Sequence, residues 1–290
     1  MNLYKVINNS LHLPNKVFYP LKNLDFKIYK NFQHKGYFYK DFSREKMEFV
    51  DKINTFINLH LDINKIKKKA ISENSKTYTI DIFEYFNKDL KLEMYNYFNS
   101  PEILKIVNSC LGHSTKLRKI SITYNFFNEN TVKDEGPKLF HRDSDSLQDQ
   151  LKLMILLNDI DKDNGMFYFI PKFLIKEDER FKLHVSRKNM DIWNKWRISD
   201  EQVNSLLKTV NFSSKIKNFK GKKREALFVD TSKVYHKGGY IKDFKKHRIL
   251  LQVIYTPKIS LSNWNNNNSK IFRFFQSKLT SLKDKTRKVV

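Results

Sequence analysis

Short runs of apolar and β-branched residues, separated by polar turns, limit what this 290-residue chain can fold into more than any other feature. Polar clusters such as 128–130 and 161–165 separate these runs in the way that turns separate strands. Several short strands of this kind indicate an antiparallel sandwich or barrel with helical cover, an α+β fold. The runs lie at residues 117–127, 138–143, 151–157, 166–170, 226–230 and 247–255.

The chain before these runs has a helical pattern instead. Met47, Val50 and Ile53 recur at helical spacing, and Pro101 and Gly112 are placed to begin and end a further helix. A charged segment with helical spacing also interrupts the strands. We therefore predict four parts: a helical N-terminal cover (1–112), a β core (113–257), a helical insertion within that core (about 174–217) and a basic C-terminal tail (258–290).

The charge is strongly positive, with 55 Lys and Arg against 31 Asp and Glu and a net charge of +24. Such a balance favours a nucleic-acid or anionic-membrane partner. The lysines are spread along the whole chain, however, and we find no zinc finger, basic zipper or RNA-recognition signature. We therefore expect a small-molecule partner, and a nucleic-acid-modifying enzyme remains an alternative.

The compartment follows from cysteine usage and from the hydrophobic pattern. Cys110 is the only cysteine, so no disulfide can form within the chain, which suits a reducing cytoplasm. No apolar run is long enough for a signal peptide or a membrane-spanning helix. We expect a soluble, cytoplasmic protein.

A His-x-Asp pair is the most informative local motif. On a strand, His141 and Asp143 project to the same face, so they can offer one imidazole nitrogen and one carboxylate oxygen to a single point. A third ligand is needed, and His236 is the best candidate, because it follows the predicted strand 226–230 and precedes a flexible Gly238. Two imidazoles and one carboxylate on one side of a metal leave adjacent positions open, as non-haem Fe(II) oxygenases require.

Arg248 strengthens this interpretation. It lies twelve residues after His236, within a predicted strand in which it shares one face with Leu250, while His247 and Ile249 take the other face. Both faces are largely apolar, so a guanidinium there needs an anionic partner. The far carboxylate of 2-oxoglutarate would supply one through a bidentate contact. The alternative is an internal ion pair with a protein carboxylate.

The two segments that carry these residues resemble a known family. The runs HRDSDSLQDQLKLMILLNDIDKDNGMFYFIP and FVDTSKVYHKGGYIKDFKKHRILLQVIYTP are similar to the phytanoyl-CoA dioxygenase family of Fe(II)/2-oxoglutarate oxygenases. The resemblance covers about residues 115–257 and implies a double-stranded β-helix, the cupin-like jelly roll. It also implies His141, Asp143 and His236 as iron ligands, Arg248 as the 2-oxoglutarate anchor, and Tyr124 and Lys152 as further residues of the co-substrate pocket.

One segment departs from the family pattern. Pro171 is followed by Lys172, where relatives commonly carry a Pro-Gly-Ser-His segment, so the substrate-side loop is not predicted by the resemblance. Asp145 is an alternative to Asp143 as the carboxylate ligand. It lies farther from His141 in the chain, and this wider spacing does not fit the paired geometry expected of the two ligands.

The predicted function is a dioxygenase that uses Fe(II), 2-oxoglutarate and O2 to hydroxylate a C–H bond of a small-molecule or lipid-like substrate, releasing succinate and CO2. Asp143 favours hydroxylation over halogenation, because related halogenases lack this carboxylate. A non-catalytic jelly-roll binding protein is the other alternative.

Overall fold

The structure is a computed structural model of the 290-residue chain. It describes residues 24–45, 47–72, 79–129, 138–143, 149–174, 197–207 and 215–258. The described helices are α2 (Phe26–Lys35), α3 (Glu48–His60), α4 (Ile63–Ser72), α5 (Lys88–Phe98), α6 (Pro101–Leu111) and α8 (Asp200–Leu207), with the 3-10 turns η2 (Phe83–Tyr85) and η4 (Lys172–Leu174). The strands are β1 (Tyr37–Asp41), β2 (Thr79–Asp81), β3 (Thr115–Phe126), β4 (Leu151–Leu156), β5 (Phe167–Ile170), β6 (Lys217–Phe219), β7 (Glu225–Asp230), β8 (Tyr235–Gly238) and β9 (His247–Pro257).

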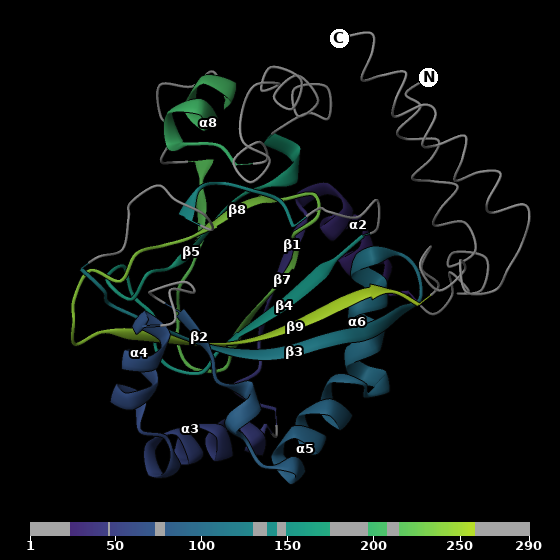
Figure 1. Ribbon diagram of the computed structural model, residues 1–290. Helices are drawn as coiled ribbons and strands as arrows, with labels where there is room; N and C mark the ends of the chain where they lie inside the picture. The colour runs from purple at the N-terminus through teal and green to yellow at the C-terminus, as the bar shows by residue number, and fades with distance from the viewer. Residues whose placement is uncertain are drawn as a thin grey trace, which may run out of the picture.

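The strands form two antiparallel sheets (Figure 1). The larger has six strands in the order β1-β7-β4-β9-β3-β2, and the smaller has three in the order β6-β5-β8. Side chains from both sheets share one apolar core, in which Met154 and Leu250 of the large sheet join Phe169 and Phe219 of the small one. Two facing antiparallel sheets with helical cover agree with the predicted jelly roll.

The central strands are buried on both faces, which explains their nearly continuous apolar sequence. On β9, Leu250 joins the core between the sheets, whereas Ile249, Leu251 and Val253 join the core under the helices. This alternation separates an inner face, directed at the small sheet, from an outer face, directed at the helices.

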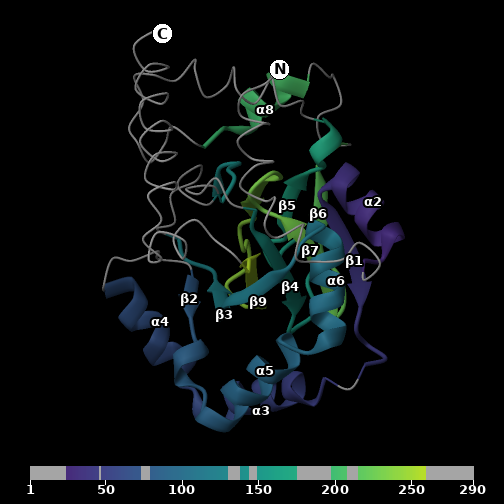
Figure 2. The same ribbon diagram turned by 90° about the vertical axis from the view of Figure 1, so that its right-hand side faces the viewer.

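Helices α3, α5 and α6 gather along the outer face of the large sheet (Figure 2). Helix α6 begins and ends where the sequence predicts: the Ser100 hydroxyl accepts a hydrogen bond from the Ile103 N–H, Pro101 occupies the first turn, and Gly112 ends the helix with φ 76°. An added Cβ at Gly112 would lie 2.5 Å from the Tyr29 ring, so the position needs glycine for space as well as conformation.

The predicted helical cover also contributes strands that the sequence did not indicate. Strand β1 pairs with β7, and β2 pairs with β3, so both extend the large sheet. Of the predicted insertion, the structure describes residues 174, 197–207 and 215–217, and the predicted tail lies outside the described residues except for Lys258. No described helix has the length and apolar character needed to cross a membrane.

Candidate metal centre

A short backbone bridge brings the two predicted histidine ligands together. The His141 N–H donates to the His236 carbonyl, and the His236 N–H donates to the His141 carbonyl, both at 2.9 Å. His236 belongs to β8, which pairs with β5 of the small sheet. The imidazole rings therefore lie side by side, with centroids 4.5 Å apart. Residues 95 positions apart in the chain become neighbours through this pairing.

Asp143 completes the cluster from the same segment as His141. Its N–H donates to the Thr231 carbonyl at 2.8 Å, which ties it to the loop before β8. Its Oδ1 lies 3.7 Å from Nε2 of His141 and 3.5 Å from Nε2 of His236. One ligand atom from each residue lies within 4.8 Å of the others. Within the described residues, this is the one cluster with the composition and geometry to hold a metal ion.

The hydrogen bonds of the imidazoles fit a metal-binding role. Nδ1 of His141 lies 2.8 Å from the Leu139 carbonyl, and Nδ1 of His236 lies 3.0 Å from the Val234 carbonyl. A carbonyl only accepts, so each Nδ1 carries the proton and each Nε2 presents its lone pair towards Asp143. Both side chains are thus held in the tautomer that a metal needs.

A second set of contacts holds the outer oxygen of the carboxylate. Lys152 Nζ lies 2.7 Å from Asp143 Oδ2, and Gln150 donates to the same oxygen at 3.4 Å. Gln150 also donates to the Thr231 hydroxyl at 3.3 Å. With Oδ2 occupied in this way, Oδ1 is the oxygen directed at the two imidazoles. The arrangement favours a carboxylate that contributes one oxygen to a metal.

The electrostatics favour the ligating protonation states. Burial lowers the pKa of His141 from 6.5 to about 3, so its imidazole is neutral near neutral pH. Burial opposes the charge of Asp143, but the Lys152 ammonium, 2.7 Å from Oδ2, holds the pKa of that carboxyl well below its usual range. A neutral imidazole and an ionised carboxylate are the forms that bind metal ions.

Arg248 lies on the inner face of β9, the face that it shares with Leu250. Its Nε donates to Asn125 Oδ1 at 3.2 Å, and its Nη1 donates to the Gly165 carbonyl. Gly165 leads into β5, where the Phe167 ring lies 5.3 Å from the His236 ring. The guanidinium is therefore buried between the sheets on the side of the metal-binding cluster, and both of these acceptors are uncharged oxygens.

Lys152 and Tyr124, the other two predicted pocket residues, have opposite placements. Lys152 joins the cluster through Asp143, whereas Tyr124 does not lie near it. Tyr124 faces the helical layer, where its ring stacks on His247 at 5.2 Å and lies under the Lys67 ammonium at 5.5 Å. The physical reason is strand alternation: Tyr124 points outward, so its neighbour Asn125 points inward to Arg248. His247 lies on the face away from Arg248, as predicted.

Three supporting residues were not predicted from the sequence. Asn125, Gln150 and Thr231 contact Arg248 or Asp143, as described above. The inward position of Asn125 could have been read from the apolar alternation of Ile120, Ile122 and Tyr124, but the roles of Gln150 and Thr231 depend on a long-range contact. Asp145 lies outside the described residues.

No protein-family model matches the sequence, and no curated protein matches it. Solved structures match its fold. The epimerase SnoN, in a crystal structure with Fe3+, alpha ketoglutarate and nogalamycin RO, has a TM-score of 0.51 and 11% sequence identity, over 79% of this chain and 82% of SnoN. The chain shares the fold of SnoN.

Two further structures are similar at a lower score. EctD from S. alaskensis with bound Fe has a TM-score of 0.49 and 14% identity, over 83% of this chain and 78% of EctD. HygX from Streptomyces hygroscopicus with nickel and 2-oxoglutarate bound has a TM-score of 0.48 and 11% identity, over 81% of this chain and 88% of HygX. The match to SnoN confirms the predicted jelly-roll fold, and membership of the phytanoyl-CoA dioxygenase family stays a prediction.

Proposed function

We propose that the protein is a non-haem Fe(II) enzyme that uses 2-oxoglutarate and O2 to hydroxylate a C–H bond of a small molecule. The observation that carries the proposal is the cluster of His141, Asp143 and His236. Arg248 supports it, because it is buried on the side of the large sheet that faces the cluster.

The donor set fits Fe(II). His141, Asp143 and His236 would hold the ion through two imidazole nitrogens and one carboxylate oxygen, a donor set that suits Fe(II) with a chelating co-substrate. When bound, iron with 2-oxoglutarate supplies the oxidising chemistry for the substrate, with succinate and CO2 as the co-products. The structural likeness to SnoN, which was crystallised with Fe3+ and alpha ketoglutarate, is compatible with this donor set.

Residues around the cluster hold the three ligands in position and limit the access of water. The carbonyls of Leu139 and Val234 keep both imidazoles in the ligating tautomer. Lys152 holds the outer oxygen of Asp143, which leaves the other oxygen as the one that would bind the ion. Because His236 is only 2% exposed, the site is shielded from bulk water on that side.

Arg248 would bind the far carboxylate of 2-oxoglutarate. A guanidinium presents two parallel N–H groups that match a carboxylate, and a buried site strengthens that pair. Asn125, which accepts from Nε, would hold the guanidinium plane in place for this contact. Hydroxylation is favoured over halogenation because Asp143 occupies the position that a halide would need.

The proposal is tested by measuring succinate formed from 2-oxoglutarate with Fe(II) and O2, without added substrate, in wild type and in His141→Ala and Asp143→Ala. We expect both variants to lose the activity. His60→Ala is the matched control, because His60 is exposed on α3 and absent from the cluster. Equal succinate formation by wild type and the two cluster variants would rule out the assignment.

A further inference from the structure

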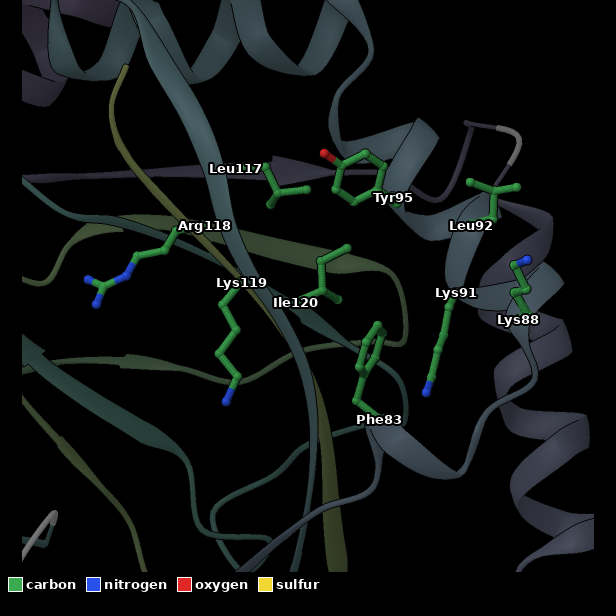
Figure 3. A pocket seen from close by; sticks show the side chains of 9 residues that line it. All are labelled: Phe83, Lys88, Lys91, Leu92, Tyr95, Leu117, Arg118, Lys119 and Ile120. Atoms are coloured by element: carbon green, nitrogen blue, oxygen red, sulfur yellow. The ribbon is translucent and has the colours of Figure 1, made fainter. Parts of the chain in front are cut away.

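A hollow of about 380 Å3 lies on the outside of the molecule between β3 and α5, and the proposed reaction does not use it (Figure 3). Its β3 residues Leu117 and Ile120 face the helical layer, whereas Lys152 and Arg248 face the other side of the sheet. The hollow is therefore separate from the metal-binding cluster. The residues that line it are Phe83, Lys88, Lys91, Leu92, Tyr95, Leu117, Arg118, Lys119 and Ile120.

The floor of the hollow is apolar and open to solvent. Phe83, Leu117, Ile120 and Tyr95 point into the space between the strand and the helix in Figure 3. Leu92 and Tyr95 on the helical side are 52% and 53% exposed. Large side chains left open in this way, next to one another, are typical of a surface that another molecule covers. The space can accept one or two large apolar side chains.

The rim of the hollow is basic. Lys88 and Lys91 come from α5, whereas the side chains of Arg118 and Lys119 leave β3 on the side away from Phe83 and Ile120 (Figure 3). Lys91 pairs with Glu84 and Lys119 with Asp81, but these carboxylates are exposed and such pairs are weak. Among the described residues, Lys88 and Arg118 have no ion pair. The rim therefore keeps an excess of positive charge that complements an acidic partner.

The backbone of β3 is also open along the hollow. Strand β9 pairs with β3 from Thr115 to Phe126, but on the other side β2 pairs only with Thr123–Asn125. Among the described residues, positions 116–121 therefore have no strand partner on that side. A bulge between Leu117 and Lys119 in the pairing with β9 distorts β3 at this point, which disfavours the addition of a long strand. A short extended segment can still use the remaining backbone groups.

We propose that this hollow, which we call the α5–β3 groove, binds an acidic polypeptide segment of another protein. One or two apolar side chains of that segment fill the space over Phe83, Leu117 and Ile120. Its carboxylates lie against Lys88 and Lys91 on the helical side of the groove. The surface is small, so the complex is transient. Most of its binding free energy comes from the apolar side chains of the segment that fill the groove, which we call the apolar anchor.

The test measures fluorescence anisotropy with a labelled peptide of about ten residues, the span of a long strand, in which Asp and Glu flank a Leu-Phe pair. We expect saturable binding that weakens roughly tenfold or more in Leu92→Glu, because the variant places a carboxylate beside the apolar anchor. Lys88→Glu should weaken binding about three- to tenfold, and the loss should shrink at high salt. The matched controls are Leu59→Glu on α3, where Leu59 is 71% exposed, and Lys30→Glu on α2.

A second peptide separates this proposal from attraction to the overall charge of +24. It keeps every acidic residue and replaces the Leu-Phe pair by Ala-Ala, and we expect it to bind at least roughly tenfold more weakly. Hydrogen exchange in the complex should slow at backbone amides in residues 117–121. Equal affinity of the two peptides, equal binding by Leu92→Glu and Leu59→Glu, or no binding overturns the proposal. So does binding of laurate in place of the peptide, which would assign the groove to a small amphipathic anion. None of these measurements depends on turnover of 2-oxoglutarate.

Discussion

Lys233 is the residue whose removal gives the clearest energetic test of the structure. Its ammonium lies 2.6 Å from Asp149 Oδ1 and 3.4 Å from Asp230 Oδ2, and the two carboxylate side chains are only 8% and 5% exposed. Lys233→Met would leave both carboxylates buried without this cation. The change also reaches the metal-binding cluster, because the same loop carries Thr231, whose carbonyl accepts from the Asp143 N–H.

The expected loss follows from the burial of these groups. Removing one partner of a buried ion pair costs about 3–5 kcal/mol. Asp149 keeps His113 at 3.2 Å and Asp230 keeps the Ser232 hydroxyl at 2.5 Å, so we expect the lower end of that range. A chain of this size loses roughly 2 °C of melting temperature for each kcal/mol. We therefore predict that Lys233→Met melts about 6 °C below wild type.

The matched control is Lys223→Met, which makes the same substitution in an ion pair of the same length. Lys223 lies 2.6 Å from Asp51, but both side chains are partly exposed, at 35% and 55%. An exposed pair contributes about 0–1 kcal/mol, so this variant should melt within about 2 °C of wild type. Adding Asp149→Asn to Lys233→Met should recover part of the loss, because it removes one of the uncompensated charges.

The measurement is thermal unfolding followed by circular dichroism or calorimetry. Burial opposes the charge of Lys233, but Asp230 and Asp149 raise its pKa above the ordinary 10.5. Because the pKa of Lys233 is higher in the folded state than in the unfolded state, its stabilising contribution to the free energy of unfolding is complete at pH values below the unfolded-state pKa. That contribution is lost only as the pH rises through the folded-state pKa. The difference in melting temperature between Lys233→Met and wild type should therefore be constant between about pH 6 and 9. Similar melting of Lys233→Met and Lys223→Met would refute the reasoning.

Three further predictions concern the proposed site. Arg248→Lys keeps the positive charge but loses the bidentate contact with a carboxylate, so we expect the KM for 2-oxoglutarate to rise roughly 10–100-fold in succinate assays. An unchanged KM would show that Arg248 does not bind 2-oxoglutarate. Asn125→Ala should also raise this KM, whereas Tyr124→Phe should not, and the reverse ranking would contradict the inner and outer faces of β3. Because burial lowers the pKa of His141 to about 3, stability of the metal-free protein should fall as pH drops from the ordinary 6.5 towards that value. His141→Gln should show a smaller fall in acid-denaturation curves, and parallel curves would count against a buried neutral imidazole.

Much of the fold could be predicted because the strands have a local signal. The apolar runs at 117–127, 151–157 and 247–255 correspond to β3, β4 and β9, and the helix bounded by Pro101 and Gly112 is α6. Strands β1 and β2 could not be predicted in the same way. They have five and three residues, and each becomes a strand by pairing with the edge of a sheet that the local sequence does not contain.

The candidate site was likewise predicted only in part. His141, Asp143, His236 and Arg248 were predicted as ligands and anchor because their residue types and spacing already limit their chemistry. Which supporting residues surround them depends on register, since one step along β3 exchanges Asn125 for Tyr124 and moves a side chain from the inner face to the outer one.

The sequence by itself determined which residue types can bind a metal and where strands and helices can form, because these properties depend on neighbours in the chain. Only the tertiary structure decided that His236 lies beside His141, that Lys152 holds Asp143, and that the α5–β3 groove is open and basic. These features arise from contacts between segments far apart in the chain. Such contacts depend on how sheets and helices pack, and no local pattern contains that information.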